Sequence, residues 1–441
     1  MPLWLQLQHT AHAIARIRAG TSGTVAFAAV DGAVRPGVQA LGFQTLRWLG
    51  RAEALRRQLA KRTPPPAADA LLCTALALGW DATQAPYEPF TLVDQAVEAA
   101  KRNPATRAQA SFINACLRRF LRERDALIAA TDHEPVAQWN HPRWWIERLR
   151  RDHPRDWQRV LAVDNLQPPM TLRINERKVE RAVYRQALAD AGLASRPVGR
   201  SGLQLDAARA VQQLPGFAQG EFSVQDAAAQ RAAPLLLDGL GEGAGDGGGP
   251  LRVLDACAAP GGKTAHLLEL AGPRGMEVTA IELDAQRSAR IGENLERLGL
   301  AAKVLVADAA RPEVWWDGVP FDAILLDAPC TASGIARRHP DVRWLRRESD
   351  VDQLSYLQAD LLRALWPLVR RGGRLLYCTC SVFRAEGSLQ IETFLARNTD
   401  CRLKPSPGHL LPQSGADARG VPDNPDGDHD GFFYALLEKA A

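Results

Sequence analysis

The spacing of apolar residues changes twice along this chain of 441 residues. Up to about residue 130, apolar side chains recur at intervals of three and four, which is the period of an amphipathic helix. This pattern predicts helices over residues 41–59, 67–78, 93–101 and 110–129, with proline-rich turns between them. Strand-like alternation is absent here. We therefore expect an all-helical domain over residues 1–140 and a short helical connector over residues 141–167.

The second pattern begins near residue 168. Apolar and polar side chains alternate over residues 169–175, as they do in a half-buried strand. A helical period follows over residues 178–191, and short strands follow that helix as far as residue 205. The sequence therefore predicts a small α+β subdomain over residues 168–220.

The third pattern occupies residues 221–441 and alternates strands with helices. Strands are expected at residues 251–255, 277–282, 303–306, 321–327 and 374–380. Such alternation predicts an α/β fold of the Rossmann-like type, with a mostly parallel sheet covered by helices on both faces. Ligands bind such sheets beyond the carboxyl ends of the strands. The polar residues at or just past those ends are Asp255, Glu282, Asp308, Asp327 and Cys380.

Composition and charge narrow the functional classes. The net charge is +4, but residues 1–160 hold 22 Lys/Arg against 14 Asp/Glu, a balance of +8 that leaves −4 for the rest. This asymmetry favours a polyanionic partner for the first part, although a solvated arginine-rich surface would look the same. The seven cysteines are an odd number and no secretory signal precedes them, which favours reduced thiols in the cytoplasm. No apolar run is long enough to predict a membrane span.

A glycine-containing turn follows the strand at residues 251–255. Walker A chemistry is disfavoured because Cys257 occupies the position of the first glycine, and a dinucleotide fingerprint is absent. The turn instead opens a helix whose backbone N–H groups can receive a carboxylate. The residues expected to bind a cofactor here are Cys257, Ala258, Ala259, Pro260, Gly261, Gly262 and Lys263.

Two acidic residues suggest which cofactor this turn holds. Glu282 lies 27 residues after Asp255, where an acidic side chain would reach a ribose diol. Asp308 ends the next strand and could meet the exocyclic amine of an adenine. A ligand with a carboxylate, a ribose and an adenine but no phosphate is S-adenosylmethionine. A structural turn with two capping acids is the alternative interpretation.

Two cysteines at strand ends indicate covalent chemistry beside that cofactor. Cys330 closes the segment 327–330, and Cys380 lies in the segment 377–381. A pyrimidine C5 becomes nucleophilic when a thiolate adds to C6, which is a form of covalent catalysis. A metal site is not expected, because Cys378 and Cys380 lack the usual two-residue gap and have no nearby second pair.

These segments resemble the NOL1/NOP2/Sun family of RNA cytosine-5 methyltransferases. The resemblance rests on residues 224–230, 255–264, 327–330, 333–341, 379–381 and 430–434. In addition, residues 112–120 resemble the signature of NusB-type RNA-binding helical domains. The combination is similar to the bacterial subfamily that methylates 16S ribosomal RNA.

The resemblance implies a seven-stranded sheet, S-adenosylmethionine as cofactor and 16S ribosomal RNA as partner. It also implies that Cys380 attacks C6 and that Cys330 assists product release. The reverse assignment stays open, because DNA cytosine methyltransferases use the thiol of the Pro-Cys motif. Asp327 would lie between cofactor and cytosine, and Lys263 would contact the target or favour the thiolate.

Several alternatives and departures remain at this point. The same chemistry could act on transfer RNA or 23S ribosomal RNA, or on DNA, and the helical domain alone would fit a non-catalytic RNA-binding or antitermination protein. Cys378 stands where the family usually has a small residue without a thiol, and we expect it to be buried. The arginines of residues 337–347 are expected to line the RNA entrance. We further expect a cytoplasmic monomer.

Overall fold

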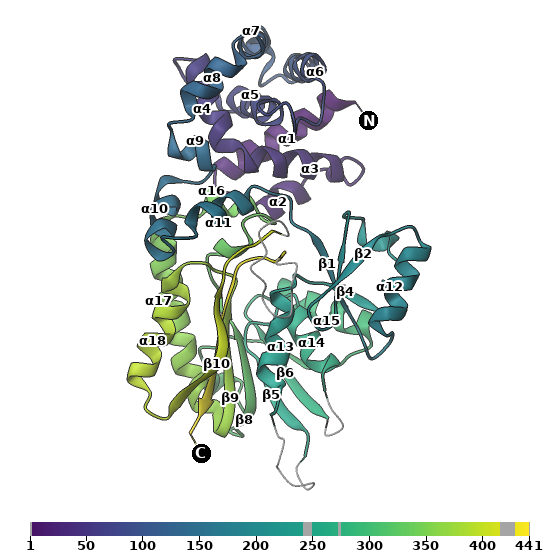
Figure 1. The fold of residues 1–441 in the computed structure, drawn as a ribbon, viewed down its shortest axis with the longest axis vertical. Coiled ribbons are helices and arrows are strands. Elements are labelled where there is room, and N and C mark those ends of the chain that lie inside the picture. Colours follow the sequence, from purple (N-terminus) through teal and green to yellow (C-terminus); the bar gives the residue numbers. More distant parts are fainter. Residues whose placement is uncertain (1, 241–248, 272–274, 415–427, 441) are drawn as a thin grey trace. The chain divides into compact units, whose positions relative to one another are not determined.

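The computed structural model describes residues 2–240, 249–271, 275–414 and 428–440 (Figure 1). The chain forms two compact units. Unit 1 comprises residues 1–167 and 336–348, and unit 2 comprises residues 168–335 and 349–441. Each unit is described separately below.

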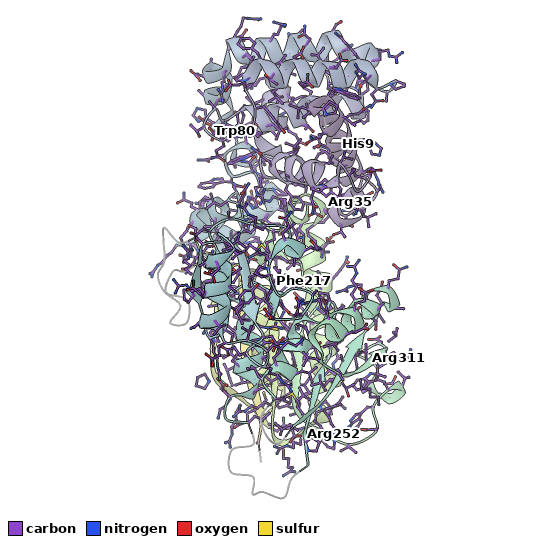
Figure 2. The ribbon with its side chains drawn as sticks, turned by 90° about the vertical axis from the view of Figure 1, so that its right-hand side faces the viewer. His9, Arg35, Trp80, Phe217, Arg252 and Arg311 are labelled. Carbon is purple, nitrogen blue, oxygen red and sulfur yellow. The ribbon has the colours of Figure 1, made fainter. Side chains whose placement is uncertain are left out.

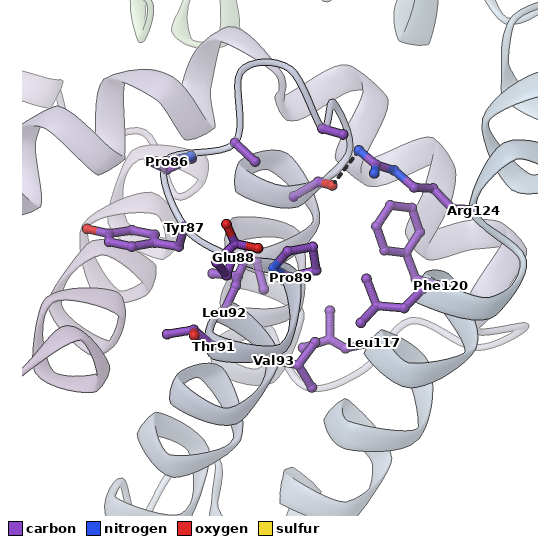
Figure 3. Close-up of a pocket in the computed structure, with 15 residues that line it drawn as sticks. Pro86, Tyr87, Glu88, Pro89, Thr91, Leu92, Val93, Leu117, Phe120 and Arg124 are labelled. Atoms are coloured by element: carbon purple, nitrogen blue, oxygen red, sulfur yellow. Dashed lines mark hydrogen bonds between the residues drawn. The ribbon is translucent and has the colours of Figure 1, made fainter.

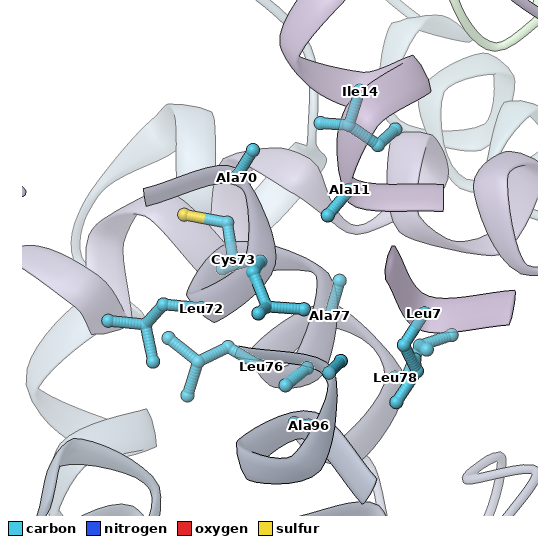
Figure 4. Close-up of a cluster of buried hydrophobic side chains, with 14 of the residues drawn as sticks. Leu7, Ala11, Ile14, Ala70, Leu72, Cys73, Leu76, Ala77, Leu78 and Ala96 are labelled. Carbon is cyan, nitrogen blue, oxygen red and sulfur yellow. The ribbon is translucent and has the colours of Figure 1, made fainter. Parts of the chain in front are cut away.

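Unit 1 is entirely helical in its described residues, as the apolar period predicts. Its α-helices are α1 (Leu3–Arg18), α2 (Gly23–Ala28), α3 (Arg35–Arg47), α4 (Leu49–Leu59), α5 (Pro66–Gly79), α6 (Pro89–Arg102), α7 (Ala110–Arg122), α8 (Arg124–Thr131), α9 (Pro135–Trp139), α10 (Arg143–Asp152), α11 (Trp157–Asp164) and α16 (Val342–Leu345). The centre is α5, in which every residue from Ala68 to Leu78 is buried (Figure 4). Its alanines allow α1, α4 and α6 to pack closely around it.

Two predicted helices are each divided in the structure. The range 41–59 is interrupted at Trp48 (φ −110°, ψ 15°), and the range 110–129 at Glu123 (φ −113°, ψ 19°). Neither junction residue is glycine or proline, and the apolar period continues through both breaks. The sequence therefore gives no local sign of the division. The first break turns α4 toward α9, where a Cβ atom on Gly50 would come within 2.3 Å of the Val136 carbonyl oxygen. Tertiary packing, which periodicity does not report, therefore sets this boundary.

Residues 336–348 belong to unit 1, although they fall inside the range 221–441 expected for the catalytic domain. Several hydrogen bonds hold this segment against the N-terminal part of the chain. They include Arg47 Nη2 to the Arg337 carbonyl (2.8 Å), the Gly23 N–H to Asp341 (2.8 Å), Trp344 Nε1 to the Leu46 carbonyl (2.8 Å) and Arg343 Nη1 to Asn165 Oδ1 (2.6 Å). The partners are about two to three hundred residues apart in sequence, so local patterns do not reveal the association.

Unit 2 begins with a small antiparallel sheet of order β2-β3-β1-β4. Its strands are β1 (Met170–Ile174), β2 (Ser195–Val198), β3 (Gly202–Leu205) and β4 (Phe222–Val224), and it carries the helix α12 (Arg181–Asp190). Leu172, Leu203 and Phe222 pack with Tyr184 and Leu188 of this helix in one buried cluster. The α+β character expected from residue 168 is present.

Two arginines join the small sheet to the larger one within unit 2. Arg173 of β1 is wholly buried and binds both carboxylate oxygens of Glu269 (2.9 and 2.8 Å). Arg297 places its guanidinium 4.3 Å from the ring of Phe217, which Figure 2 labels, and donates to the Phe217 carbonyl (3.0 Å). Both contacts fix the small sheet against helices of the large one.

The large sheet has seven strands in the order β10-β11-β9-β8-β5-β6-β7. They are β5 (Leu251–Asp255), β6 (Met276–Glu282), β7 (Lys303–Val306), β8 (Phe321–Asp327), β9 (Val369–Thr379), β10 (Cys401–Leu410) and β11 (Phe432–Lys439). The strands β9, β8, β5, β6 and β7 pair in parallel. The strand β11 lies between β9 and β10 and pairs antiparallel with both. The predicted mostly parallel, Rossmann-like sheet is confirmed.

Helices cover both faces of this sheet. They are α13 (Ala232–Leu237), α14 (Gly262–Glu269), α15 (Ala285–Leu298), α17 (Glu348–Leu365) and α18 (Ser388–Arg397). Alternate strand residues point to opposite faces, so Val253 and Leu254 belong to two different buried clusters. None of the helices in the described parts of the chain is long and apolar enough to cross a bilayer.

Candidate active site

The carboxyl ends of the parallel strands bring several of the predicted residues together. Asp255 ends β5, Glu282 ends β6 and Asp327 ends β8. The residue Cys378 pairs with Asp327 across β9 and β8, and Cys380 follows one residue after β9 ends. Asp308, two residues beyond β7, is half-buried and accepts the Ala310 N–H (2.9 Å). Among the described residues, no hydrogen bond or ion pair joins Asp308 to these other strand-end residues.

The glycine-containing turn runs from β5 into α14. Gly261 has φ +93°, a left-handed conformation that side chains rarely adopt, and it precedes the first residue of α14. Thr264 donates to the Asp255 carboxylate (2.7 Å), which fastens the helix to the strand end. Arg173 donates to the Gly262 carbonyl (2.8 Å), so the small sheet also supports this turn. The sequence alone did not single out Arg173.

Asp255 is wholly buried beneath the turn. Burial raises the pKa of its carboxyl to about 7, because a carboxylate loses hydration there, while the hydrogen bond from Thr264 opposes the shift. Its Oδ1 atom has no hydrogen-bond partner among the described residues. The site therefore contains an acceptor that the folded chain leaves unsatisfied.

Glu282 supports the same turn from β6. Its side chain is buried and accepts the Ala259 N–H (3.3 Å) and the Asp284 N–H (3.1 Å), and Arg287 lies 3.5 Å away. A carboxylate offers about four acceptor positions, so these contacts leave room for a diol. Glu282 thus both supports the turn and keeps acceptor capacity for a ligand.

Lys263 and Cys378 hold the two oxygens of Asp327. The Lys263 Nζ atom lies 2.6 Å from Oδ2, and the Cys378 thiol donates to Oδ1 at 3.4 Å. The pKa of Lys263 is raised by the neighbouring Asp327 despite a desolvation that acts in the opposite direction. The pKa of Cys378 is raised well above its usual value by burial and by Asp327, so this thiol stays protonated. Cys378 is buried, as expected.

The two strand-end thiols face each other. The sulfur atoms of Cys330 and Cys380 lie 3.4 Å apart, and both residues are half-buried. The hydrogen bond to Cys380 is the main cause that raises the pKa of Cys330, and burial adds to it. The raised pKa keeps the Cys330 thiol protonated beside the Cys380 sulfur. The pKa of Cys257 is also raised, in this case by burial and by the surrounding acids.

A buried carboxylate that the sequence analysis missed lies behind the thiols. Glu386 ends a short 3-10 helix, Arg384–Glu386, and is 0% exposed. Its carboxylate accepts hydrogen bonds from Thr331 and Ser381, the residues directly after Cys330 and Cys380. Its sequence neighbours Arg384, Gly387 and Ser388 give no local sign of burial, so the sequence offered no signal for it.

Two arginines of the segment after Cys330 do not fit the expected role of lining an RNA entrance. Arg337 and Arg343 are 1% and 0% exposed, and Arg343 donates to the carbonyl oxygens of Asn140 and Asp164 within unit 1. The pKa of Arg343 is lowered to about 10 by burial. These two arginines therefore cannot present their charge to RNA, because their guanidinium groups are enclosed by protein.

Two open cavities of about 620 and 530 Å³ lie in unit 1. The larger is lined by α5, α6, α7 and the connecting loop, and Arg124 closes one side by donating to the Gly79 carbonyl (Figure 3). None of the predicted cofactor or catalytic residues lines either cavity. Within the described ranges, no group of three His, Cys, Asp or Glu side chains is placed to hold a metal ion.

Comparisons with known proteins agree with this architecture. The model of the 16S rRNA methyltransferase RsmB/F family matches residues 250–438, and the NusB family model matches residues 8–122. The ferredoxin-like domain of RsmF/B-like methyltransferases matches residues 141–212, which includes α10 and α11. Ribosomal RNA small subunit methyltransferase B of Pseudomonas syringae pv. tomato is 41% identical over 91% of this chain and 89% of its own length.

The chain belongs to the RsmB/F family of methyltransferases. A second family member, ribosomal RNA small subunit methyltransferase B of Pseudomonas putida, is 40% identical over 93% of this chain and 92% of its own length. The crystal structure of PH0851 has a TM-score of 0.72 and 25% identity, covering 98% of this chain and 99% of that one. A methyltransferase homolog from Pyrococcus horikoshii has a TM-score of 0.55 and 25% identity, covering 69% and 97%. The NusB-like helical domain and the methyltransferase sheet therefore occur together in a known architecture.

Proposed function

We propose that this chain transfers a methyl group from S-adenosylmethionine to C5 of a cytosine in 16S ribosomal RNA, through an adduct between Cys380 and C6. The 3.4 Å separation of the Cys330 and Cys380 sulfur atoms beside the glycine-containing turn carries the proposal. The curated relatives are named as methyltransferases of small-subunit ribosomal RNA, which favours 16S ribosomal RNA over transfer RNA, 23S ribosomal RNA or DNA.

The residues around the turn fit S-adenosylmethionine. The buried Asp255 Oδ1 atom lacks a partner in the described chain, and Glu282 retains acceptor capacity for a ribose diol. Asp308 is half-buried, and its Oδ1 atom already accepts the Ala310 N–H. Gly261 and Gly262 have no side chains, so a ligand can approach the main chain closely at the start of α14. When bound, this cofactor supplies an electrophilic methyl group.

Cys380 is the proposed nucleophile. Its sulfur receives the Cys330 hydrogen bond, and the ammonium group of Lys263 contributes positive charge to the same site. The thiolate is the nucleophilic form of a cysteine, so Cys380 is proposed to attack in that form. The Cys380 electron pair forms the bond to C6 of the cytosine, and the electrons of the C5–C6 double bond become available at C5.

Cys330 is proposed to assist release of the methylated base. A base removes the C5 proton, the C5–C6 double bond re-forms, and the bond from C6 to Cys380 breaks. The electron pair of that bond returns to the Cys380 sulfur. Because Cys330 keeps its proton, it donates a hydrogen bond to the departing thiolate. Lys263 and Cys378 meanwhile fix Asp327, which is proposed to lie between cofactor and cytosine.

Labelled methyl transfer tests the proposal directly. The protein is incubated with methyl-labelled S-adenosylmethionine and 16S ribosomal RNA, 23S ribosomal RNA, transfer RNA or DNA, and the modified base is identified by mass spectrometry. We expect 5-methylcytosine in 16S ribosomal RNA. Label only in another nucleic acid, or on an atom other than C5, would contradict the proposal, and no label at all would favour a non-catalytic RNA-binding role.

The two thiols are separated by their single substitutions. Cys380→Ala should form no covalent protein–RNA adduct, and Cys330→Ala should accumulate one that migrates slowly in a denaturing gel. Cys116→Ala, a buried helical cysteine in unit 1, serves as the matched control. An adduct that persists in Cys380→Ala and disappears in Cys330→Ala would reverse the assignment.

A further inference from the structure

Glu386 connects the two loops that carry the thiols. Its Oε1 atom accepts the Thr331 N–H (2.8 Å) and Gln358 Nε2 (3.2 Å), and its Oε2 atom accepts the hydroxyls of Thr331 (2.5 Å) and Ser381 (2.6 Å). Thr331 directly follows Cys330, and Ser381 directly follows Cys380. One carboxylate therefore binds the next residue after each thiol.

The surroundings of Glu386 make this connection rigid. Its own carbonyl oxygen accepts the Tyr377 hydroxyl (2.9 Å), and Gln358 also donates to the Pro329 carbonyl (2.8 Å), one residue before Cys330. Ser381 in turn lies 2.9 Å from the hydroxyl of Ser333. The side chains of Thr331, Ser381 and Glu386 are all 0% exposed. A buried network whose members are satisfied holds one geometry, because any rearrangement would leave a polar group unpaired.

We propose that Glu386 is a positioning residue that sets the spacing of Cys330 and Cys380, and so controls the step that needs both thiols. This inference rests on the proposed function for its catalytic consequence. Glu386 itself makes no contact with the reacting atoms. Its four carboxylate hydrogen bonds come from neutral donors, so it is not the counter-ion of a cation. Its negative charge also helps to raise the pKa of Cys330.

The variants distinguish geometry from charge. Glu386→Ala removes all four carboxylate bonds. Glu386→Gln keeps one carbonyl oxygen for the Thr331 N–H, and its amide group can donate to the Ser381 and Thr331 hydroxyls, which can reverse their roles. A positioning role therefore predicts a large effect of alanine and rescue by glutamine. Glu392→Ala is the matched control, since Glu392 is an exposed acid on the adjacent helix α18.

The catalytic measurement is the decay of the protein–RNA adduct in a single turnover. Small misplacements of catalytic groups cost about 100-fold in rate, so we expect Glu386→Ala to slow decay by about that factor. Glu386→Gln and Glu392→Ala should stay within about threefold of the unmodified chain. In a Cys330→Ala background, Glu386→Ala should slow decay no further, because the second thiol is already gone. Equal slowing in both backgrounds would overturn the proposal.

A second measurement reads thiol spacing without methylation. Phenylarsine oxide bridges two neighbouring thiols with loss of one water, and mass spectrometry locates the bridged peptides. We expect a Cys330–Cys380 bridge to form about tenfold more slowly in Glu386→Ala, and at the original rate in Glu386→Gln. Unchanged bridging in Glu386→Ala would overturn the inference. Slowed bridging together with no RNA adduct in any variant would instead overturn the proposed function and leave the positioning role standing.

Folding of Glu386→Ala is monitored, so that slower adduct decay can be told apart from a loss of the fold. Glu386→Ala should lower the thermal unfolding temperature, because four buried donors lose their acceptor. S-adenosylmethionine affinity should change little, because Glu386 does not contact the glycine-containing turn. If Glu386→Ala does not fold, Thr331→Val replaces it, since that change removes one hydroxyl bond at nearly constant volume. Thr331→Val should slow adduct decay about tenfold in the chain with Cys330 and not at all in the Cys330→Ala background. A change in the latter background would contradict the proposal.

Discussion

The Cys378 thiol donates a hydrogen bond to the Asp327 carboxylate across two paired strands, at a sulfur–oxygen distance of 3.4 Å. Lys263 holds the other oxygen of the same carboxylate at 2.6 Å. Both groups keep their protons, because burial and Asp327 raise the pKa of the thiol and Asp327 raises that of the lysine. The extra cysteine beside Cys380 therefore has a structural partner in Asp327, which argues against a role for its thiol in the proposed chemistry.

Replacement of Cys378 tests that interpretation. Cys378→Ala should lower the methylation rate several-fold, since Asp327 loses one of its two fixed contacts and a small cavity remains. We expect an unfolding penalty of about 1–2 kcal/mol. Cys378→Ser keeps a donor to Asp327 and should recover most of the rate. Methylation kinetics and urea unfolding measure both effects, and a loss as complete as that of Cys380→Ala would mean that Cys378 takes part in the chemistry.

The polar residues along the edge of the sheet were predictable from sequence, because the apolar pattern shows where each strand ends. The limits of β7 and β8 coincide with the predicted ranges 303–306 and 321–327, and the acids at or near their ends follow from those limits. Parallel strands must place their carboxyl ends along one edge, so the meeting of Lys263 with Asp327 follows from topology. The 3.4 Å approach of Cys330 to Cys380 has the same origin.

Other features depend on contacts between residues far apart in sequence. Glu386 is an ordinary acid until folding brings Thr331 onto it from 55 positions away. Arg343 resembles an exposed RNA contact in sequence, yet it binds Asn165 across 178 positions. Trp48 ends a helix without any breaker residue, because α4 turns to pack on α9. Periodicity and spacing report local preference, so they miss each of these.

The proton of Cys330 gives a second prediction. Cys380 raises the pKa of Cys330 through their hydrogen bond, so Cys380→Ala should lower it. We expect the midpoint of the pH dependence of Cys330 alkylation by iodoacetamide to fall by about one pH unit or more, as for other coupled pairs. Peptide mass spectrometry at a series of pH values measures it. Cys378→Ala leaves the pair intact and should not shift the midpoint; an equal midpoint in all three chains would show that the sulfurs do not interact.

Asp255 predicts a specific dependence of stability on pH. Its folded pKa of about 7 lies above the ordinary value of 3.8, so the folded state binds the proton more tightly than the unfolded state. Stability from this group is fully present below about pH 4 and is lost as pH rises from there through 7, with a total cost on the order of 4 kcal/mol. Asp255→Asn removes that dependence.

Urea unfolding of the original chain and Asp255→Asn between pH 4.5 and 7.5 isolates this contribution, because other titrating groups are common to both proteins. The free energy of unfolding of the variant, relative to the original, should rise across this range. Asp317→Asn serves as a control, since Asp317 is an exposed carboxylate whose pKa is lowered mainly by the Val319 N–H. A constant difference between Asp255→Asn and the original chain would mean that Asp255 is ionised throughout.

The segment 336–348 yields the last prediction. Arg343 is its main anchor in unit 1, where it donates to the Asn140 carbonyl (3.2 Å), Asn165 Oδ1 (2.6 Å) and the Asp164 carbonyl (2.7 Å). Arg343→Met should destabilise unit 1 by about 3–5 kcal/mol, since these buried acceptors lose their donor.

Detachment of the segment should also make it a substrate for trypsin. We expect cleavage after Arg346 or Arg347 to accelerate at least tenfold in Arg343→Met, as followed by mass spectrometry under native conditions. Arg143→Ala is the control, because the Arg143 side chain is 76% exposed and forms an ion pair with the exposed Glu147 on the same helix. Because residues 336–348 continue directly from the loop of Cys330, methylation should slow in Arg343→Met and not in Arg143→Ala. Rapid cleavage with undiminished methylation would show that the Cys330 loop keeps its geometry without this anchor.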